Sequence, residues 1–374
     1  MPELVADIGT LVGCESPSAD LAAVAASADV VAHVGALRLG VEPERIVLDG
    51  RTHLRWRLGT GPRRVLVLGH HDTVWPHGTL AEHPFAVTDG VLRGPGCFDM
   101  KAGLVMAWYA VAALADPDGI TLLVTGDEEL GSPSSRELIE TEARGCAAVL
   151  VLEAAGEHGA AKVRRKGVSL YEVTVHGRAA HAGLEPERGI NATAELAHQV
   201  HAVAALADPD LGTTVTPTRM HSGTTSNTVP AGGAFAVDVR VSTRAEQDRV
   251  DAAMHALSPV LPGAGLTVEG GPNRPPLEVA ASAALFARAR RLAGSLGLPA
   301  LDGVAVGGAS DGNFTAGIGV PTLDGLGASG DGAHAEHEHV LVDELPGRTA
   351  LLAALLAELL ADPAPVEAVA EVRG

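Results

Sequence analysis

Apolar runs that read as strands and alternate with helical segments constrain the fold of this chain most strongly. In the order of the chain, three such runs are "RRVLVLGHHD", "GITLLVTGDEE" and "AAVLVLEAA", and the helical segments between them are "MKAGLVMAWYAVAALA" and "SSRELIETEA". Strands that are apolar on both faces and are joined by helices belong to mostly parallel sheets with helices on both sides. We therefore predict an α/β fold, a sheet flanked by helices.

The pattern changes near Gly167. The segment "GVSLYEVTVHG" alternates like a strand with one solvent-facing side, and the segments after it read as helix, strand, strand, helix and strand. This β-α-β-β-α-β order suits a small antiparallel sheet with two helices on one face. We therefore expect an inserted, smaller α+β (ferredoxin-like) domain at 168–276, within a discontinuous domain formed by 1–167 and 277–374.

Composition limits the kinds of partner and location. The 374 residues are 46% hydrophobic, which is enough for a packed core, and their formal net charge of −19 repels nucleic acid and anionic membranes. The N-terminus lacks the basic region of a signal peptide, and we expect no run long enough to span a bilayer. The three cysteines are far apart and odd in number, which fits a reducing compartment. We expect a cytoplasmic protein with a loose tail from Asp362.

Polar residues follow the first of the buried strands, at His70, His71 and Asp72. Ligands of an open α/β sheet bind beyond the carboxyl ends of its strands. Side chains alternate along an extended segment, so His70 and Asp72 share a side, and a metal-bound imidazole usually donates its other N–H to a carboxylate. A plain polar turn is the alternative, and this motif alone favours it.

Acidic residues stand at the corresponding ends of further segments. Asp99 precedes a helix and either caps it or points into the crevice beyond the sheet. Glu128 and Glu129 either belong to an exposed acidic loop or divide two roles, one binding a cation and the other acting as general base. Glu153 ends an apolar strand and needs a partner, which is a metal, a lysine or a helix N-terminus, because an unpaired buried charge is costly.

A histidine-rich loop near the C-terminus, "GDGAHAEHEHV", offers His334, His337 and His339, one of which could complete a metal site. Two imidazoles and three carboxylates suffice for two Zn²⁺ ions that share one carboxylate. Two dications, three carboxylates and one bridging hydroxide also balance in charge. The conjunction of these segments therefore predicts a site for two Zn²⁺, with Co²⁺ or Mn²⁺ as possible occupants.

The sequence resembles the di-zinc metallopeptidase family that includes glutamate carboxypeptidase (carboxypeptidase G), acetylornithine deacetylase, succinyl-diaminopimelate desuccinylase and aminoacylase-1. The resemblance covers essentially the whole chain apart from the tail. It implies a zinc-peptidase-like sheet, an inserted lid and dimerisation domain, and a homodimer formed through that domain. The motifs that carry it, in the family's order, are "GHHDTV", "GPGCFDMKAG", "GDEELGS", "LEAA", "GRAAHAG", "SGTTSNTVPAGG" and "GAHAEHEHV".

The resemblance also implies roles for single residues of the first domain. Asp72 matches the aspartate that orients the first zinc histidine, and Glu128 matches the general base. His334 is the last ligand, rather than His337 or His339, because Glu338 four residues later fits the family's H-x-x-x-E pattern. The metal ligands that the resemblance implies are His70, Asp99 as the bridge, Glu129, Glu153 and His334.

In the inserted domain, His181 matches a histidine that steadies the developing oxyanion, in dimeric relatives from the other subunit. Its alternative is a plain residue of a turn between strand and helix. Asn227 resembles a substrate-contacting group. Arg240 and Arg274 resemble positions that can hold a substrate carboxylate, and surface or ion-pair arginines are the alternative for both.

The implied reaction is hydrolysis of an amide bond that releases a C-terminal amino acid from a small peptide or N-acyl amino acid, by a metal-bridged hydroxide with Glu128 as base. Two alternatives stay open. One is an N-acyl-amino-acid deacylase of the acetylornithine deacetylase or aminoacylase type, and the other is a non-catalytic ligand-binding relative. Ala154 and Ala155 depart from residues that are frequent in glutamate carboxypeptidases, and Trp75 and His77 stand near the expected pocket mouth, so the preferred substrate side chain stays open.

Overall fold

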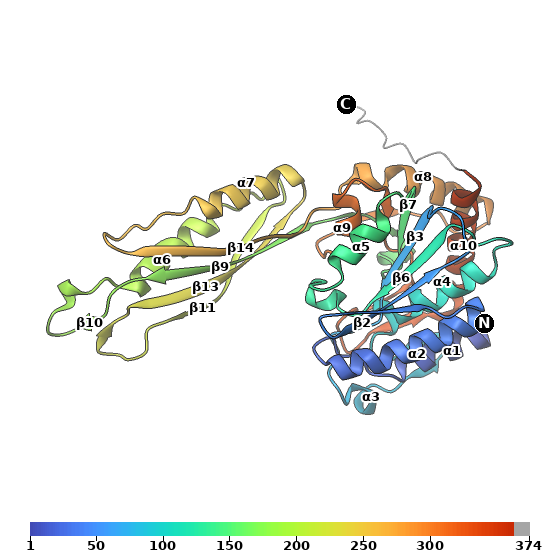
Figure 1. The fold of residues 1–374 in the computed structure, drawn as a ribbon, viewed down its shortest axis with the longest axis horizontal. Helices are drawn as coiled ribbons and strands as arrows, with labels where there is room; N and C mark the ends of the chain where they lie inside the picture. Colours follow the sequence, from blue (N-terminus) through green and yellow to red (C-terminus); the bar gives the residue numbers. More distant parts are fainter. Residues whose placement is uncertain (363–374) are drawn as a thin grey trace. The chain divides into compact units, whose positions relative to one another are not determined.

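The computed structural model describes residues 1–362, and the remainder of the tail that we expected to be loose lies outside the described residues. The chain divides into two compact units (Figure 1). Of the described residues, the first unit comprises Met1–Arg164, Leu277–Val306 and 310–362. The second comprises Arg165–Pro276 and Gly307–Ala309.

The first unit is built on a mixed sheet of six strands. The neighbours β6, β3, β7 and β16 run parallel, whereas β2 is antiparallel to β6 and β1 is antiparallel to β2. In sheet order the strands are β1 (Glu44–Leu48), β2 (Arg51–Arg57), β6 (Ile120–Thr125), β3 (Val65–His70), β7 (Ala148–Val151) and β16 (Thr322–Leu323).

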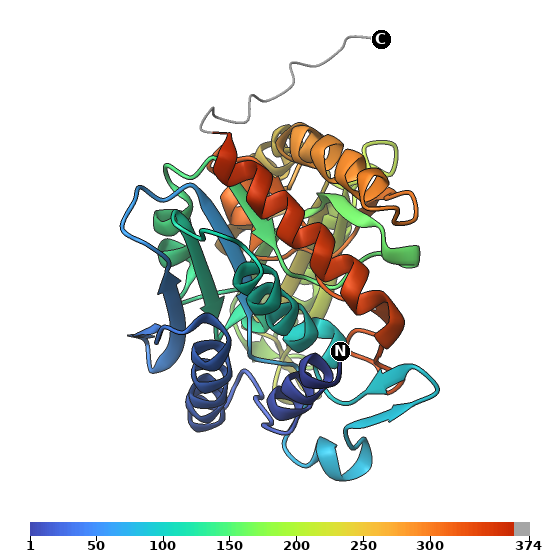
Figure 2. The same ribbon diagram turned by 90° about the vertical axis from the view of Figure 1, so that its right-hand side faces the viewer.

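Helices cover both faces of this sheet, which explains why its central strands are apolar throughout. Val65 and Val67 of β3 pack in one core with α1, α2, α4, α8 and α10, and Figure 2 looks onto the face crossed by α10, α4 and α1. Leu66 and Leu68 point the other way and pack with α5 and α9. The helices are α1 (Pro2–Val12), α2 (Leu21–Leu39), α4 (Ala102–Ala112), α5 (Arg136–Ala143), α8 (Val279–Ser295), α9 (Gly312–Gly317) and α10 (Leu345–Ala361).

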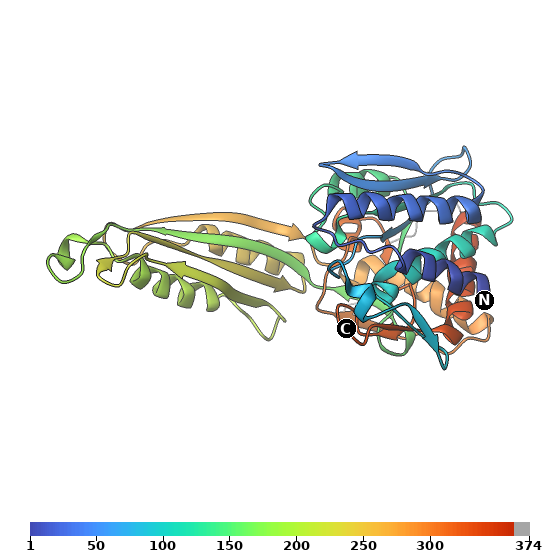
Figure 3. The ribbon, with the colours of Figure 1, turned by 90° about the horizontal axis from the view of Figure 1, so that it is seen from below.

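Helix α2 is the one segment among residues 1–362 that is long and apolar enough to cross a membrane by length and composition. The expectation that no run reaches that length is therefore wrong. Val24, Ala28 and Val31 of this helix are nevertheless buried inside the unit, and the helix lies along β2 (Figure 3). In this structure α2 is a helix of the core.

The second unit is an antiparallel sheet in the order β11-β13-β9-β14 with two helices packed on it. Val173 and Val175 of β9 form its core with Leu196 of α6 and Val250 of α7. This arrangement is ferredoxin-like, and the predicted fold class is confirmed. Its elements are β9 (Gly167–His176), α6 (Ala192–Ala204), β11 (Thr214–Ser222), β13 (Gly232–Val241), α7 (Arg244–His255) and β14 (Gly265–Arg274).

Shorter elements surround these sheets, and the sequence patterns predicted only some of them. Asp89 and Gly90 join a hairpin of β4 (Ala86–Thr88) and β5 (Val91–Arg93), which continues into β18 (His339–Leu341) and β17 (Gly330–Asp331). The other short elements are α3 (Thr79–Glu82), η1 (Cys97–Lys101), η2 (Glu128–Leu130), η3 (Glu157–Gly159), β8 (Ala161–Arg165), β10 (Ala180–His181), η4 (Pro186–Arg188), β12 (Thr228–Val229), β15 (Gly303–Val306) and η5 (Val342–Glu344).

Two predicted helices have different ends in the structure. A helix was expected to start near Met100, but α4 begins at Ala102, because Asp99 and Met100 have non-helical dihedral angles within a separate helical turn. The second helix predicted in the inserted domain, α7, ends at His255, ahead of Pro259. Pro259 disfavours helical geometry at the residue before it, which accounts for an early end.

Candidate metal centre

The end of β3 sends its two histidines in opposite directions. His70 Nδ1 lies 2.9 Å from the backbone oxygen of Asp72 and 3.4 Å from its carboxylate, so Nδ1 carries the proton and Nε2 is left to face the cluster. His71 is buried elsewhere, with Nδ1 3.2 Å from Ser27 Oγ and Nε2 3.0 Å from the oxygen of Thr52. Burial lowers the pKa of His71 to about 4.

The carboxylate of Asp72 has a second task that the sequence did not predict. It is fully buried and accepts the backbone N–H groups of Glu128 and Glu129, each at 3.2 Å. A single aspartate therefore lies against His70 and also holds the turn that carries the two glutamates.

The turn after β6 is an ordered part of the interior rather than an exposed acidic loop. Asp127 is fully buried and accepts hydrogen bonds from the backbone and hydroxyl groups of Ser134 and Ser135, at 2.5 to 3.2 Å. Glu128 is only 7% exposed. Asp127 and Asp72 thus fix this turn from two sides.

Asp99 lies between the two histidines that the sequence singled out. Its Oδ1 is 3.3 Å from His70 Nε2, and its Oδ2 is 3.3 Å from His334 Nε2. The capping alternative does not hold, because Lys101 occupies the N-cap position of α4 and no side chain caps that helix.

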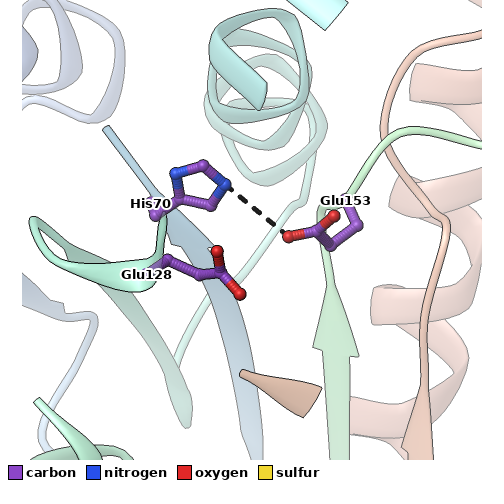
Figure 4. Close-up of side chains that lie close together, drawn as sticks. All are labelled: His70, Glu128 and Glu153. Atoms are coloured by element: carbon purple, nitrogen blue, oxygen red, sulfur yellow. Dashed lines mark ion pairs between the residues drawn. The ribbon is translucent and has the colours of Figure 1, made fainter. Parts of the chain in front are cut away.

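Each histidine has a further carboxylate beside it. Glu153, just beyond β7, lies 3.6 Å from His70 Nε2, and Glu129 lies 3.2 Å from His334 Nε2. Among residues 1–362, two groups have ligand atoms close enough to hold a cation: His70 with Glu128 and Glu153, and His70 with Asp99 and Glu129. Figure 4 shows the first group, in which the carboxylates of Glu128 and Glu153 both turn toward His70.

The electrostatics of the cluster fit bound cations. Burial alone would lower the pKa of His70, but hydrogen bonds to Asp72, Asp99 and Glu153 raise it well above its ordinary value. Hydrogen bonds to Asp99 and Glu129 raise the pKa of His334 to about 10. Burial raises the pKa of Glu129, because it removes the charged carboxylate from water, and the nearby negative charge of Asp99 acts in the same direction. The carboxylates thus favour positive charge around both imidazoles, which a proton supplies in the metal-free protein and a bound cation would supply in its place.

The other two histidines of the C-terminal loop are not part of this cluster. His339 Nδ1 lies 2.9 Å from the backbone oxygen of His337, and the structure shows no contact of either ring with the carboxylates named above. His334 differs from them in its left-handed backbone, with φ of 63°, and half of its side chain is exposed.

The predicted residues of the inserted domain lie in the second unit. Strands β10 and β12 pair His181 with Thr228, and the Ala182 N–H donates to the Asn227 oxygen at 2.9 Å, so the segments of His181 and Asn227 adjoin. His181 Nδ1 accepts the N–H groups of Gly183 and Leu184, both at 3.1 Å. This leaves the ring proton on Nε2, at an exposed position.

The two predicted arginines differ in their surroundings. Arg240 makes a bidentate pair with Asp238, at 2.8 and 2.9 Å, so part of its donor capacity is already used. Arg274 ends β14 and is 7% exposed, and its backbone oxygen accepts from Gln247 at 2.9 Å.

Sequence reasoning missed the carboxylates that hold the site together. Asp127 was read only as part of an acidic run, and Glu338 was read only as part of a spacing pattern. Asp311 was not singled out, although it is 3% exposed and accepts from Thr125 Oγ1 at 3.1 Å and from Ser132 Oγ. The only signal for Asp127 was the pair of serines that follows the acidic run, because serines can donate to such a carboxylate.

The α/β fold and the cluster of histidines and carboxylates at its strand ends define a metal-dependent hydrolase. A model of "Peptidase family M20/M25/M40" matches residues 66–358. The chain belongs to this family and is a metallopeptidase or amidohydrolase enzyme. The resemblance found in the sequence is thereby confirmed, and the non-catalytic alternative is set aside.

Two curated relatives illustrate the family. Carboxypeptidase G2 from Pseudomonas sp. (strain RS-16) is 30% identical over 319 residues, which cover 80% of this chain and 75% of that protein. A succinyl-diaminopimelate desuccinylase from Dechloromonas aromatica (strain RCB) is 30% identical over 364 residues, which cover 86% of this chain and 90% of that protein.

Solved structures share the fold at lower identity. Aminopeptidase PepT from Bacillus cereus ATCC 10987 has a TM-score of 0.73 and 22% identity, covering 96% of this chain and 98% of that one. The YXEP protein from Bacillus subtilis is described as a dinuclear metal binding peptidase from the M20 family. It has a TM-score of 0.64 and 13% identity, covering 96% of this chain and 98% of that one.

The neighbours His70 and His71 provide a matched pair of variants. We expect His70→Ala to lose at least one equivalent of bound metal, because its Nε2 faces the carboxylates. We expect His71→Ala to keep its metal and to lose about 1–3 kcal/mol of unfolding free energy, because Thr52 and Ser27 lose a buried partner. Elemental analysis after dialysis and thermal unfolding measure the two effects. The opposite pattern would place the ligand one residue further along the chain.

Proposed function

We propose that this enzyme uses two metal ions to hydrolyse an amide bond and release a C-terminal amino acid from a small peptide or N-acyl amino acid. One observation carries the proposal: the two oxygens of Asp99 each face a different histidine, His70 and His334, at 3.3 Å. A carboxylate placed in this way suits two adjacent cations.

We propose three ligands for each ion, supported by the contacts between the side chains. His70, Asp99 and Glu153 would hold one, and Asp99, Glu129 and His334 would hold the other. Zn²⁺ suits imidazole and carboxylate ligands, and Co²⁺ or Mn²⁺ are alternatives. When bound, the ions supply an activated water and a Lewis acid for the scissile carbonyl.

Glu128 is the proposed general base. It precedes the ligand Glu129 on a turn held by Asp72, and its carboxylate lies within reach of the His70 side of the cluster. In this role it takes the proton of the attacking water and passes it to the leaving amine. Because Glu128 also fits a cation-binding group with His70 and Glu153, metal analysis must separate the two roles.

Glu128→Gln and Glu129→Gln form a matched pair of adjacent substitutions. We expect Glu128→Gln to keep two metal equivalents while kcat falls by about 10²–10⁴-fold, because only the base is lost. We expect Glu129→Gln to bind one ion less tightly. The readouts are metal content per chain and steady-state kinetics. If Glu128→Gln lost an ion as well as activity, Glu128 would be a ligand and the proposed mechanism would fail.

His181 is the proposed oxyanion donor, supported by the hydrogen bonds that fix its proton on Nε2. We expect His181→Ala to lower kcat by about 10²–10³-fold with the metal content unchanged. His176→Ala, a second exposed histidine of the same unit, is the control and should behave like wild type. An unchanged kcat in His181→Ala would exclude the role.

We also propose a homodimer through the second unit and a cytoplasmic location. The support for the dimer is the resemblance of the segment "GRAAHAG" to the family's motif. The support for the cytoplasmic location is that the three cysteines are free thiols, as in a reducing compartment. A mixture of Glu128→Gln and His181→Ala chains would regain activity if His181 acts across the dimer, whereas no recovery after subunit exchange would favour action within one chain.

The similarity to carboxypeptidase G2 favours release of a C-terminal amino acid, with Asn227, Arg240 and Arg274 as groups that contact the substrate. The similarity to a desuccinylase over nearly the whole chain supports the alternative, an N-acyl-amino-acid deacylase.

Both reactions break the same kind of bond, so substrates must separate them. We expect the highest kcat/KM with folate-like or dipeptide substrates, measured against a panel of N-acetyl and N-succinyl amino acids. A preference for the N-acyl amino acids by tenfold or more would make the deacylase the better description.

A further inference from the structure

The side chain of Glu338 joins segments that carry different parts of the metal centre. It is 3% exposed, and its Oε1 accepts the backbone N–H groups of Phe98 at 2.8 Å and Asp99 at 3.0 Å. Its Oε2 accepts the Gly96 N–H and Trp75 Nε1, both at 2.8 Å. Both oxygens are therefore occupied by N–H donors, and Glu338 itself is not among the residues that face the cations.

Most of these donors belong to the backbone that places Asp99. Three of them come from the turn at 96–99, which has no regular helical geometry at Asp99, so helix hydrogen bonds do not fix this residue. Gly96 there has φ of +71°, and a Cβ on it would lie 2.5 Å from Thr73 Cγ2. The Lys101 N–H closes this turn onto the Gly96 oxygen at 3.0 Å, and Glu338 supplies the acceptor for the N–H groups of Gly96, Phe98 and Asp99.

The same glutamate also closes the loop that carries His334. The backbone N–H of Glu338 donates to the backbone oxygen of Ala335 at 2.8 Å, and the backbone N–H of Ala335 donates to the backbone oxygen of Gly332 at 2.8 Å. Strands β17 and β18 pair on either side, with Asp331 opposite His339. His334 therefore sits in a short closed loop whose last turn ends at Glu338.

We propose that Glu338 is a positioning residue that sets Asp99 and His334 relative to each other. It thereby determines how tightly the cation at Asp99, Glu129 and His334 binds. The inference rests on the proposed two-metal function. The site formed by Asp99, Glu129 and His334 depends on Glu338 through two of its ligands. The side chain holds the turn of Asp99 directly, and it ties the end of the His334 loop to that turn. The site formed by His70, Asp99 and Glu153 depends on it only through Asp99. Loss of Glu338 therefore affects the two sites unequally.

Glu338→Gln tests this dependence. An amide has one acceptor oxygen, so two of the N–H groups that face Glu338 would meet an NH₂ group instead. We expect the binding step at the site of Asp99, Glu129 and His334 to weaken by about 10–100-fold, the range typical of groups that orient metal ligands. The other step should change much less. Calorimetric titration of the chelator-stripped protein with Zn²⁺, repeated with Co²⁺ and read by its visible spectrum, measures both steps.

Two further variants make the result specific. Glu336→Gln removes the same charge from the same loop at an exposed position and should leave both steps unchanged. Trp75→Phe removes one of the donors and leaves the carboxylate in place, so it should weaken the same step by a smaller factor. Trp75→Phe also keeps the test decisive if Glu338→Gln does not fold.

The outcomes separate this inference from the proposed function. If the wild-type protein does not bind two ions, the proposed function fails. If the wild type binds two ions and Glu338→Gln binds them as tightly, only the positioning role fails. Equal weakening of both steps, together with a lower unfolding temperature of the metal-free protein, would reduce Glu338 to a structural residue and also overturn the proposal.

Discussion

The burial of carboxylates at the ends of strands is the constraint on which this site depends. A buried carboxylate must be matched by donors or cations, because its transfer from water is costly. Asp72, Asp127 and Glu338 meet this requirement largely with backbone N–H and hydroxyl donors from neighbouring turns. Asp99 and Glu129, in contrast, face the imidazole of His334, and Asp99 also faces that of His70. The first group shapes the turns, and the second is left for the proposed cations.

Close backbone packing brings these strand ends together. A Cβ on Gly103 would lie 2.3 Å from the oxygen of Leu152, and one on Gly327 would lie 2.2 Å from the same atom. Both glycines let their segments press against the chain just before Glu153. A Cβ on Gly69 would lie 2.7 Å from Leu104 Cδ2, next to His70. Helix α4 can therefore approach β3 and the end of β7 closely, and the distance between His70 and Glu153 follows from this contact.

The sequence predicted the fold where periodicity is strong. Strand β3 and helix α4 stood out because burial on both faces of a parallel sheet leaves a continuous apolar run and a long helix beside it. It did not predict β17, β8 or the turn at Cys97–Lys101, because their geometry comes from tertiary hydrogen bonds rather than from local propensity.

The same limit applied to the site. His70 and Glu153 stood out because they follow apolar runs, whereas the choice of Asp99, Glu129 and His334 as ligands came from the family resemblance. The assignment of these residues as ligands stays a prediction, although the structure brings them together. The roles of Asp127 and Glu338 could not be read from the sequence, because a carboxylate that accepts backbone N–H groups looks the same there as an exposed one.

In the proposed site, metal binding and protonation compete for the same side chains. The pKa values of His70 and His334 are raised by the carboxylates around them, so in the metal-free protein both rings tend to hold protons. A metal ligand must present an unprotonated nitrogen, and metal uptake therefore releases protons and weakens as the pH falls. The carboxylates that draw cations into the site are the same groups that retain protons on its histidines. The strength of metal binding thus depends on how close those carboxylates are held to the rings. The turns fixed by Asp72 and Glu338 set that separation.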